Sequence, residues 1–313
     1  MLKNEFEKVE HNQVSGLRYF INDIRYRRPH LHFDTEILYV IEGEGIVYTQ
    51  QTEYKLYPGQ IMVFNSCQMH EFRSNAIYLI LQLPLTSFAF SYPVLDAVFF
   101  DSKPVDIPKN SLYLQHLFQA AKSYFEDSPH QPLKTIGMTY LVLNDLLDLA
   151  QFDILNNSQK NKLLDLQKRF QRISATIQEN FVNGISLQEL ADQEGFSKTY
   201  FSHFFKKNFG ISFQAYMDNI RCEYGRTLLL TTRENLLNVT NLCGFCDVRT
   251  FNKSFAKRYG CSPKDFRKLK QAGTEAMPEQ RADSGTGTVD QQRIFSPSES
   301  LAELHKLLNF LNL

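Results

Sequence analysis

No apolar run in this 313-residue sequence approaches the roughly 18 residues that a membrane-spanning helix needs. The first residues lack the apolar core of a secretory signal, and the five cysteines do not form a disulfide framework in so long a chain. The sequence also contains no P-loop, nucleophile elbow or Rossmann glycine pattern. These absences predict a soluble protein of the reducing cytoplasm, with no membrane association and no sign of an enzyme.

The charge of the sequence is distributed unevenly. The formal net charge is zero, and hydrophobic and charged residues make up 43% and 22% of the chain, as in ordinary folded proteins. Counting Lys and Arg against Asp and Glu gives −4 for residues 1–164, +7 for residues 165–271 and −3 for residues 272–313. A basic block beside acidic ones predicts that only the middle part meets a polyanion.

Two periodicities divide the chain. Residues 15–83 contain short runs of β-branched and aromatic residues separated by Gly, Pro and Asn turn signals, which predicts the strands of a sandwich or barrel. From Leu112 the apolar spacing becomes helical. We therefore predict a multidomain α+β protein with an N-terminal β-barrel, two following helices and an all-α C-terminal domain. The predicted domains are residues 1–105, a helical region at 106–158, the all-α domain at 159–271, and a linker and tail at 272–313.

The tail has a composition of its own. Residues 272–297 are rich in Gly, Ser, Thr, Pro and Gln, which predicts a flexible linker. A short amphipathic helix with a leucine stripe follows, and Ser300 with Glu303 forms a possible capping box. Three roles stay open for this helix: it docks on its own protein, it binds a partner, or it is foreign to the natural protein.

An internal repeat in the C-terminal half is the strongest signal in the sequence. Gly195-Phe196 matches Gly244-Phe245 at an offset of 49 residues, and the aromatic residues that follow match at an offset of 50. Each copy predicts a short helix, a turn at a glycine with positive φ, and a second helix whose aromatic residues face inward. The chain is therefore expected to contain two helix-turn-helix units.

The outer face of each second helix carries polar and basic residues, which suit the major groove of DNA. Arg249 and Asn252 are the candidates for base contacts, while Lys206, Lys207 and their counterparts are expected to contact phosphates. A solvated helix face is the alternative for a single helix, but two copies argue against it. The predicted DNA-binding residues are Lys198, Thr199, Ser202, His203, Lys206, Lys207, Asp247, Arg249, Asn252, Lys253, Lys257 and Arg258.

These units resemble the DNA-binding domain of the AraC/XylS family of transcription regulators. The resemblance spans residues 165–271 and is carried by the segments Ile185-Ser186-Leu187-Gln188-Glu189-Leu190-Ala191, Gly244-Phe245, Tyr259-Gly260, Ser262-Pro263 and Phe266-Arg267. It implies a regulator that binds double-stranded DNA, forms a homodimer through the helices before residue 158, and contacts RNA polymerase. Gly225, Thr240 and Cys243 depart from the residues that are usual in the family, which puts local packing in question.

The N-terminal half resembles cupin motifs through His30, His32, Glu36 and His70, with Gly43 seven residues after the glutamate. Three interpretations stay open: effector contacts, a three-histidine, one-carboxylate metal site, or a structural cluster. The family resemblance implies a barrel that binds an effector without metal, so no cofactor is expected. The predicted effector-binding residues are His30, His32, Glu36, Tyr39, Tyr48, His70 and Phe72.

The predicted function is that of an effector-responsive activator of carbohydrate-related genes, with a sugar-like effector as the leading candidate. Two alternatives stay open, a metal-dependent cupin enzyme and a constitutive regulator without an effector. Cys243 and Cys246 form a CxxC pattern, but no second ligand pair lies at a suitable spacing, so no metal site is expected there.

Overall fold

The computed structural model describes residues 5–6, 14, 16–90, 92–126, 128–209, 211–271 and 291–310. These residues form two compact units, and each is described by itself. The strand-rich unit contains residues 6–164 and 290–313, and the helical unit contains residues 1–5 and 165–289. Helix α4 (Asn157–Asn180) crosses the division between Leu164 and Asp165. No helix in the described ranges is long and apolar enough to cross a membrane.

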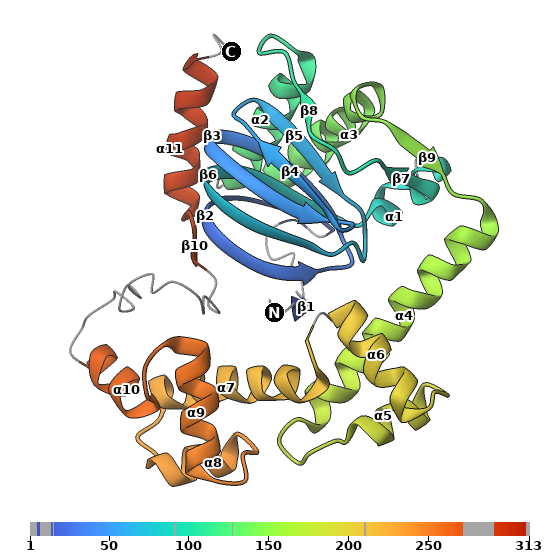
Figure 1. Cartoon of the computed structure of the whole chain (residues 1–313). Coiled ribbons are helices and arrows are strands. Elements are labelled where there is room, and N and C mark those ends of the chain that lie inside the picture. Colours follow the sequence, from blue (N-terminus) through green and yellow to red (C-terminus); the bar gives the residue numbers. More distant parts are fainter. Residues whose placement is uncertain are drawn as a thin grey trace. The chain divides into compact units, whose positions relative to one another are not determined.

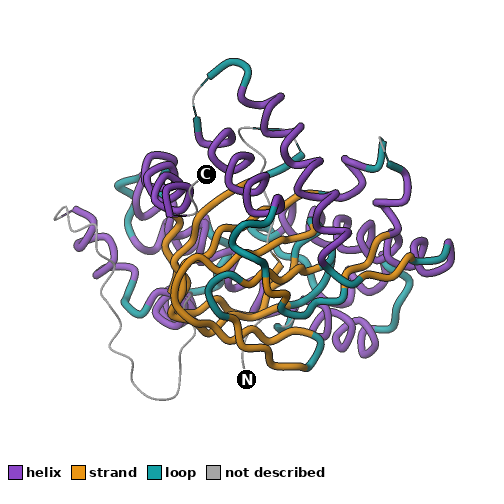
Figure 2. The backbone as a smooth tube through the Cα atoms, turned by 90° about the horizontal axis from the view of Figure 1, so that it is seen from above, coloured by secondary structure: helices purple, strands orange, loops and turns teal. Residues whose placement is uncertain are grey.

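The strand-rich unit is built on one antiparallel sheet with long, curved strands (Figures 1 and 2). The hydrogen-bonded order is β1-β2-β6-β3-β5-β8, with β10 on β2 and β4 on β3, while β7 and β9 form a separate ribbon. The strands are β1 (Glu5–Phe6), β2 (Arg18–Leu31), β3 (Thr35–Thr49), β4 (Thr52–Leu56), β5 (Gln60–Phe64), β6 (His70–Leu83), β7 (Val98–Phe100), β8 (Val105–Asp106), β9 (Phe152–Ile154) and β10 (Gln291–Ile294).

This arrangement confirms the expected α+β class but corrects one detail. The predicted barrel is not closed, because the order within the described residues ends at β1 and β8 and these strands do not pair with each other. Both are two residues long, too short to complete a ladder. The sheet curls without a continuous ring of hydrogen bonds.

The sheet buries both of its faces, and side chains alternate between them along β3. Leu38 and Val40 point into the interior of the curled sheet, where Phe64 and Phe72 also lie. Ile37 points to the other face. That face is covered by α2 (Leu112–Phe125) and α3 (Gln131–Leu149), and it continues to α1 (Leu85–Phe88) and the 3-10 helix η1 (Pro93–Ala97).

The tail returns to the strand-rich unit. Strand β10 pairs antiparallel with β2, and the Asn22 side chain donates to Gln292 Oε1 at 2.8 Å. Helix α11 (Pro297–Phe310) packs against α2 with Leu304 and Leu308 buried (Figure 1). Of the three roles left open for the tail helix, the structure therefore contains the docked one. Within the expected linker at 272–297, residues 291–294 are a strand and Pro297 begins α11, while residues 272–290 lie outside the described residues.

The helical unit contains two short helix pairs joined by a longer helix (Figure 1). The first pair packs Phe201, Phe205 and Phe209 inward, and the second packs Phe251 and Phe255 in the same way. Both predicted aromatic cores are confirmed. The helices after α4 are α5 (Leu187–Gln193), α6 (Lys198–Phe209), α7 (Phe213–Thr231), α8 (Leu236–Leu242), α9 (Val248–Tyr259) and α10 (Pro263–Gln271).

Candidate functional site

The first helix-turn-helix unit has a cap at each helix start. Ser186 and Glu189 form a capping box at α5, in which the Ser186 amide donates to Glu189 Oε2 at 2.7 Å and the Glu189 amide donates to Ser186 Oγ at 3.1 Å. Gly195 takes a φ of +72° at the turn, and Ser197 accepts the Tyr200 amide at the start of α6. The predicted glycine turn with positive φ is confirmed, and Ser197 provides the cap of the helix that follows it.

The second unit repeats this geometry with one additional constraint. Asp247 caps α9 by accepting the Thr250 amide at 2.7 Å, and Gly244 takes a φ of +78°. A Cβ at position 244 would lie 2.4 Å from the carbonyl oxygen of Val182, so the turn approaches the backbone after α4 as only glycine permits. Asp247, predicted to contact DNA, has its carboxylate engaged in this cap.

The structure places the predicted DNA-contact residues along α6 and α9. All six in the first unit are exposed, and so are Arg249, Lys253 and Lys257 in the second. Asn252 is half-buried. Arg258 differs from the rest because its guanidinium lies 3.4 Å from Glu223 and donates to the Tyr259 hydroxyl at 3.1 Å, which ties it to α7 and its own helix.

Charged residues that fasten the turns were missed by the sequence analysis. Glu194, just before the turn glycine, accepts from Arg169 at 3.0 Å and from Arg172 at 2.8 Å, both on α4. Arg221 on α7 donates to the Phe181 carbonyl at 2.7 Å. The Glu194 contacts hold the first turn against α4, and the Arg221 contact holds α7 against the segment that follows α4. The spacing of Arg169 and Arg172 by three residues was the available signal.

Only one cysteine of the CxxC pair has a packing role. Cys243 is buried beside Phe251 in the core of the second unit, and burial raises the pKa of its thiol to about 12. Cys246 is exposed. A neutral, buried thiol is a poor metal ligand and nucleophile, so the pattern has a structural explanation.

In the strand-rich unit the predicted effector residues divide into two groups. His30, His32, Glu36 and His70 meet in the interior of the curled sheet, and one ligand nitrogen of each histidine lies within 4.8 Å of the others. Phe72 lines the same place, with its ring 6.2 Å from that of His30. The other two predicted residues lie elsewhere: Tyr39 packs on Phe118 of α2, and Tyr48 is exposed.

The curl of the sheet creates this cluster. Gln82 and His70 lie near opposite ends of β6, yet both reach the same carboxylate. Gln82 Nε2 donates to Glu36 Oε2 at 2.8 Å, and His70 Nε2 lies 3.6 Å from Glu36 Oε1. His30 stands opposite His70 in the β2–β6 register, which supplies the third side of the cluster.

Burial and neighbouring charges set the ionisation of the cluster. Burial, together with the charges of His70 and Arg27, holds the pKa of His30 well below its ordinary value of 6.5. Burial raises the pKa of Glu36, but the His32 and His70 side chains beside the carboxylate outweigh this effect and hold the pKa well below its ordinary value of 4.5. His30 is therefore a neutral imidazole beside an anionic carboxylate at neutral pH.

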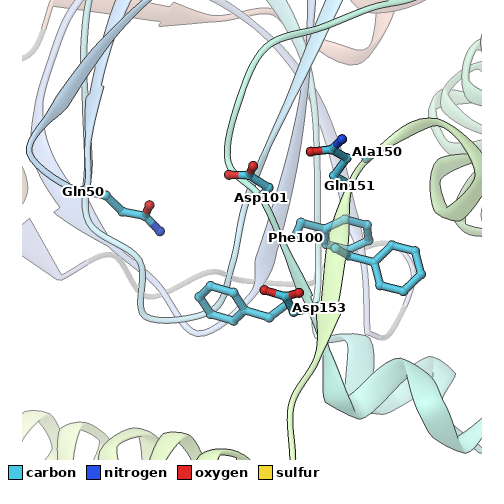
Figure 3. A pocket seen from close by; sticks show the side chains of 8 residues that line it. Gln50, Phe100, Asp101, Ala150, Gln151 and Asp153 are labelled. Carbon is cyan, nitrogen blue, oxygen red and sulfur yellow. The ribbon is translucent and has the colours of Figure 1, made fainter.

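A separate cavity of about 680 Å³ lies between the turn after β3 and the β7–β9 ribbon (Figure 3). Gln50 faces it from the turn, while Asp101, Gln151 and Asp153 face it from the ribbon side (Figure 3). Its remaining lining residues are Phe99, Phe100, Ala150 and Phe152. Sequence analysis missed this cavity because its walls come from segments some 50 residues apart that carry no shared motif. The cavity offers amides, carboxylates and aromatic rings to a small polar ligand.

Comparison with known proteins matches both units. Residues 14–140 match the profile of the AraC-like ligand binding domain, and residues 190–269 match that of a helix-turn-helix domain. The chain belongs to the AraC family of transcription regulators. The family expected from the two repeated units is thereby confirmed, and the ligand-binding domain of this AraC-family protein contains both the histidine cluster and β2 to β8.

Relatives of this AraC-family protein are distant. An uncharacterized HTH-type transcriptional regulator of Staphylococcus aureus is 22% identical over 248 residues, covering 76% of this chain and 32% of that protein. The virulence regulon transcriptional activator VirF of Yersinia enterocolitica is 29% identical over 138 residues, covering 44% of this chain and 51% of VirF. The C-terminal domain of the two-component response regulator yesN from Fusobacterium nucleatum is 36% identical with a TM-score of 0.31, covering 32% of this chain and 98% of that domain. The chain thus spans about a third of the length of the Staphylococcus relatives.

Proposed function

We propose that this protein regulates transcription by placing α6 and α9 in successive major-groove segments of double-stranded DNA. The observation that carries the proposal is the duplicated unit, capped and turned alike in both copies, with exposed Lys, Arg, Ser and Thr side chains outside and aromatic residues inside. Two recognition helices on one chain suit a site longer than one groove segment. A regulator of this kind acts on the chromosome, so we place the protein in the cytoplasm and assign it no catalytic activity.

The exposure and contacts of residues on α6 and α9 indicate which of them contact the DNA bases. Arg249 is exposed in the first turn of α9, where recognition helices contact base edges. Thr199 and Ser202 occupy the corresponding part of α6 and are exposed as well. Because Arg258 contacts Glu223, we assign it to positioning α9 on α7.

The test is capture of genomic DNA fragments by the purified protein, followed by titration of the best fragment against salt. We expect tight binding to a few sites and a steep loss of affinity with rising salt concentration. Uniform weak binding to all fragments, with and without candidate effectors, would contradict the proposal.

We further propose that the 680 Å³ cavity binds the effector and that this effector is sugar-like. Phe99 and Phe152 supply aromatic faces, and Asp101, Asp153 and Gln151 supply acceptors and donors for hydroxyl groups. The ribbon strand β9 leads directly into α4, which continues into the helical unit. An effector that favours one position of the ribbon would thereby bias the DNA-binding units.

A thermal-shift screen of sugars tests the effector site. A ligand that raises the unfolding temperature of the wild-type protein should lose this effect in Asp153→Asn, while the exposed control Asp148→Asn should respond as wild type. A ligand that stabilises Asp153→Asn equally would place the effector elsewhere. If every sugar fails while DNA binding is strong, the constitutive alternative is favoured.

We also propose a homodimer through α3 and, by extension from the family, activation through contact with RNA polymerase at carbohydrate-related genes. On α3, Leu133 and Leu141 are exposed at 77% and 41%, and Gly137 lies between them on the same face. An apolar stripe with a small central residue suits a helix–helix contact between two copies.

A further inference from the structure

The three histidines of the interior cluster share one hydrogen-bond arrangement. Nδ1 of His30 lies 2.9 Å from the Arg28 carbonyl, Nδ1 of His32 lies 2.8 Å from the Asp34 carbonyl, and Nδ1 of His70 lies 3.0 Å from the Gln68 carbonyl. A carbonyl oxygen only accepts, so each Nδ1 carries a hydrogen and donates it. In the neutral imidazole, the lone pair is then on Nε2.

The Nε2 atoms of two of these histidines face the buried carboxylate of Glu36. His32 Nε2 lies 3.1 Å from Glu36 Oε2, and His70 Nε2 lies 3.6 Å from Oε1. Glu36 Oε1 and His70 Nε2 are both buried and have no hydrogen-bond partner. Lone pairs on nitrogen and on a carboxylate repel one another at this distance, so the arrangement requires either added protons or a cation.

We propose that His30, His32, His70 and Glu36 bind a divalent first-row transition-metal ion such as zinc or iron(II). Three neutral imidazoles and one carboxylate form a donor set that these ions favour. Bonds from Nδ1 to backbone carbonyls are the usual outer contacts of metal-bound histidines, since they fix the ring and its tautomer. The cation would satisfy both unpartnered atoms, in contrast to the expectation from sequence that this cluster binds an effector without metal.

The distances in the cluster agree with this assignment. Ligand atoms about 2.0 Å from a tetrahedral zinc ion are about 3.3 Å apart. The two nitrogen–oxygen distances bracket this value, and the three histidine ligand atoms, within 4.8 Å of one another, need only a modest contraction. Four protein ligands without exposure are typical of a structural ion. Such an ion would join the ends of β2, β3 and β6, and the proposal is independent of the effector cavity.

To test this, the 313-residue protein is treated with a chelator and then titrated with zinc, cobalt(II) or manganese(II). We expect about one equivalent of metal per chain, a higher unfolding temperature with metal, and a cobalt spectrum of nitrogen and oxygen ligation without sulfur charge-transfer bands. Failure to bind zinc, cobalt or manganese would overturn the proposal and leave protonated histidines as the counter-charge of Glu36. A sulfur-ligated spectrum would overturn it too, because it would assign the ion to cysteines.

Two variants locate the ion, and a third serves as the control. Glu36→Gln and His70→Gln should lower the affinity for zinc at least about tenfold and abolish the rise in unfolding temperature. The exposed His130→Gln, in the same unit, should bind zinc as wild type does. Equal binding by all three would overturn the proposal. If both cluster variants fail to fold, X-ray absorption spectroscopy of the zinc-loaded wild-type protein can count the imidazole ligands of the ion. Fewer than two imidazole ligands would contradict the proposed site.

Discussion

Gly225 in α7 lies directly beneath the ring of Phe251 in α9, so closely that a Cβ at position 225 would be 2.9 Å from two ring carbons. The same Cβ would lie 3.1 Å from the sulfur of Cys243. Positions 225 and 243 both depart from the residues that are usual in the family, and the two departures belong to one packing arrangement. The Phe251 ring and the Cys243 sulfur fill the space that the methyl group of an alanine at position 225 would occupy.

Replacing this glycine should destabilise the protein although alanine is the better helix former. In Gly225→Ala, the gain in helix propensity is about 1 kcal/mol, and the crowding of a fully buried ring costs about 1–3 kcal/mol. Thermal and denaturant unfolding of the purified variant measures the net loss. The control is Thr227→Ala, at an exposed position of the same helix, where the gain in helix propensity should remain. Stabilisation by both substitutions would contradict the packing argument.

Base-reading and phosphate-contacting residues should differ in how their loss affects DNA binding. Arg249→Ala should weaken binding to the best site by about 1–3 kcal/mol and relax its sequence preference. Lys206→Ala should weaken binding to all sequences alike and lower the slope of affinity against salt by about one. Fluorescence anisotropy at several salt concentrations separates the two effects. Lys55→Ala, at an exposed position of β4, should leave both quantities unchanged. An equal loss of affinity for all sequences in Arg249→Ala would contradict its role in base reading.

The docked tail should contribute to the stability of the strand-rich unit. Leu304 of α11 is fully buried in the hydrophobic core of the strand-rich unit. Leu304→Ala should therefore lower the free energy of unfolding by about 2–5 kcal/mol. Thermal unfolding measures this, with the exposed His305→Ala as the control. An unchanged unfolding temperature for Leu304→Ala would mean that α11 is not packed on α2 in solution.

Acid should weaken the helical unit through Glu223. Burial raises the pKa of this carboxyl, but hydrogen bonds from Tyr259 at 2.5 Å and Arg226 at 2.7 Å outweigh it, so the pKa lies below 4.5. The unfolded chain then binds the proton more readily, and the stabilisation present above pH 4.5 is lost as the pH falls through the lower, folded value. Unfolding measured against pH should show a shallower acid decline in Glu223→Gln and in Tyr259→Phe. An identical decline in wild type and both variants would assign the acid sensitivity to other groups.

The proposed dimer should depend on the apolar stripe of α3. Leu133→Glu combined with Leu141→Glu should shift the protein from dimer to monomer, because two exposed leucines become charged at the contact. Analytical ultracentrifugation measures the change, and the exposed Lys55→Ala on β4 should leave the association intact. A dimer that survives the double substitution would require a contact elsewhere.

The sequence by itself determined the two helix-turn-helix units. Gly195 and Gly244 act on residues within a few positions of themselves, so the two turns could be predicted without knowledge of the fold. Asp247 was instead predicted to contact DNA, and the structure shows its carboxylate capping α9. Repetition then identified the aromatic cores and the outer faces. The sequence pattern did not show which residues on the outer faces form contacts within the protein instead of with DNA. Arg258 contacts Glu223, and this contact could not be predicted because the two residues are 35 positions apart in the sequence.

Only the tertiary structure decided what happens in the strand-rich unit. Glu36 meets both Gln82 and His70 because the sheet curves, and the register shifts that accompany this curvature lie in β3, between Val40 and Glu42, and in β2. The sequence motif brought His30, His32, Glu36 and His70 together as candidates, but it also included Tyr39 and Tyr48, which the alternation of β3 and its bulge send elsewhere. The docking of β10 on β2 depended likewise on an edge strand some 270 residues away, for which no local signal exists.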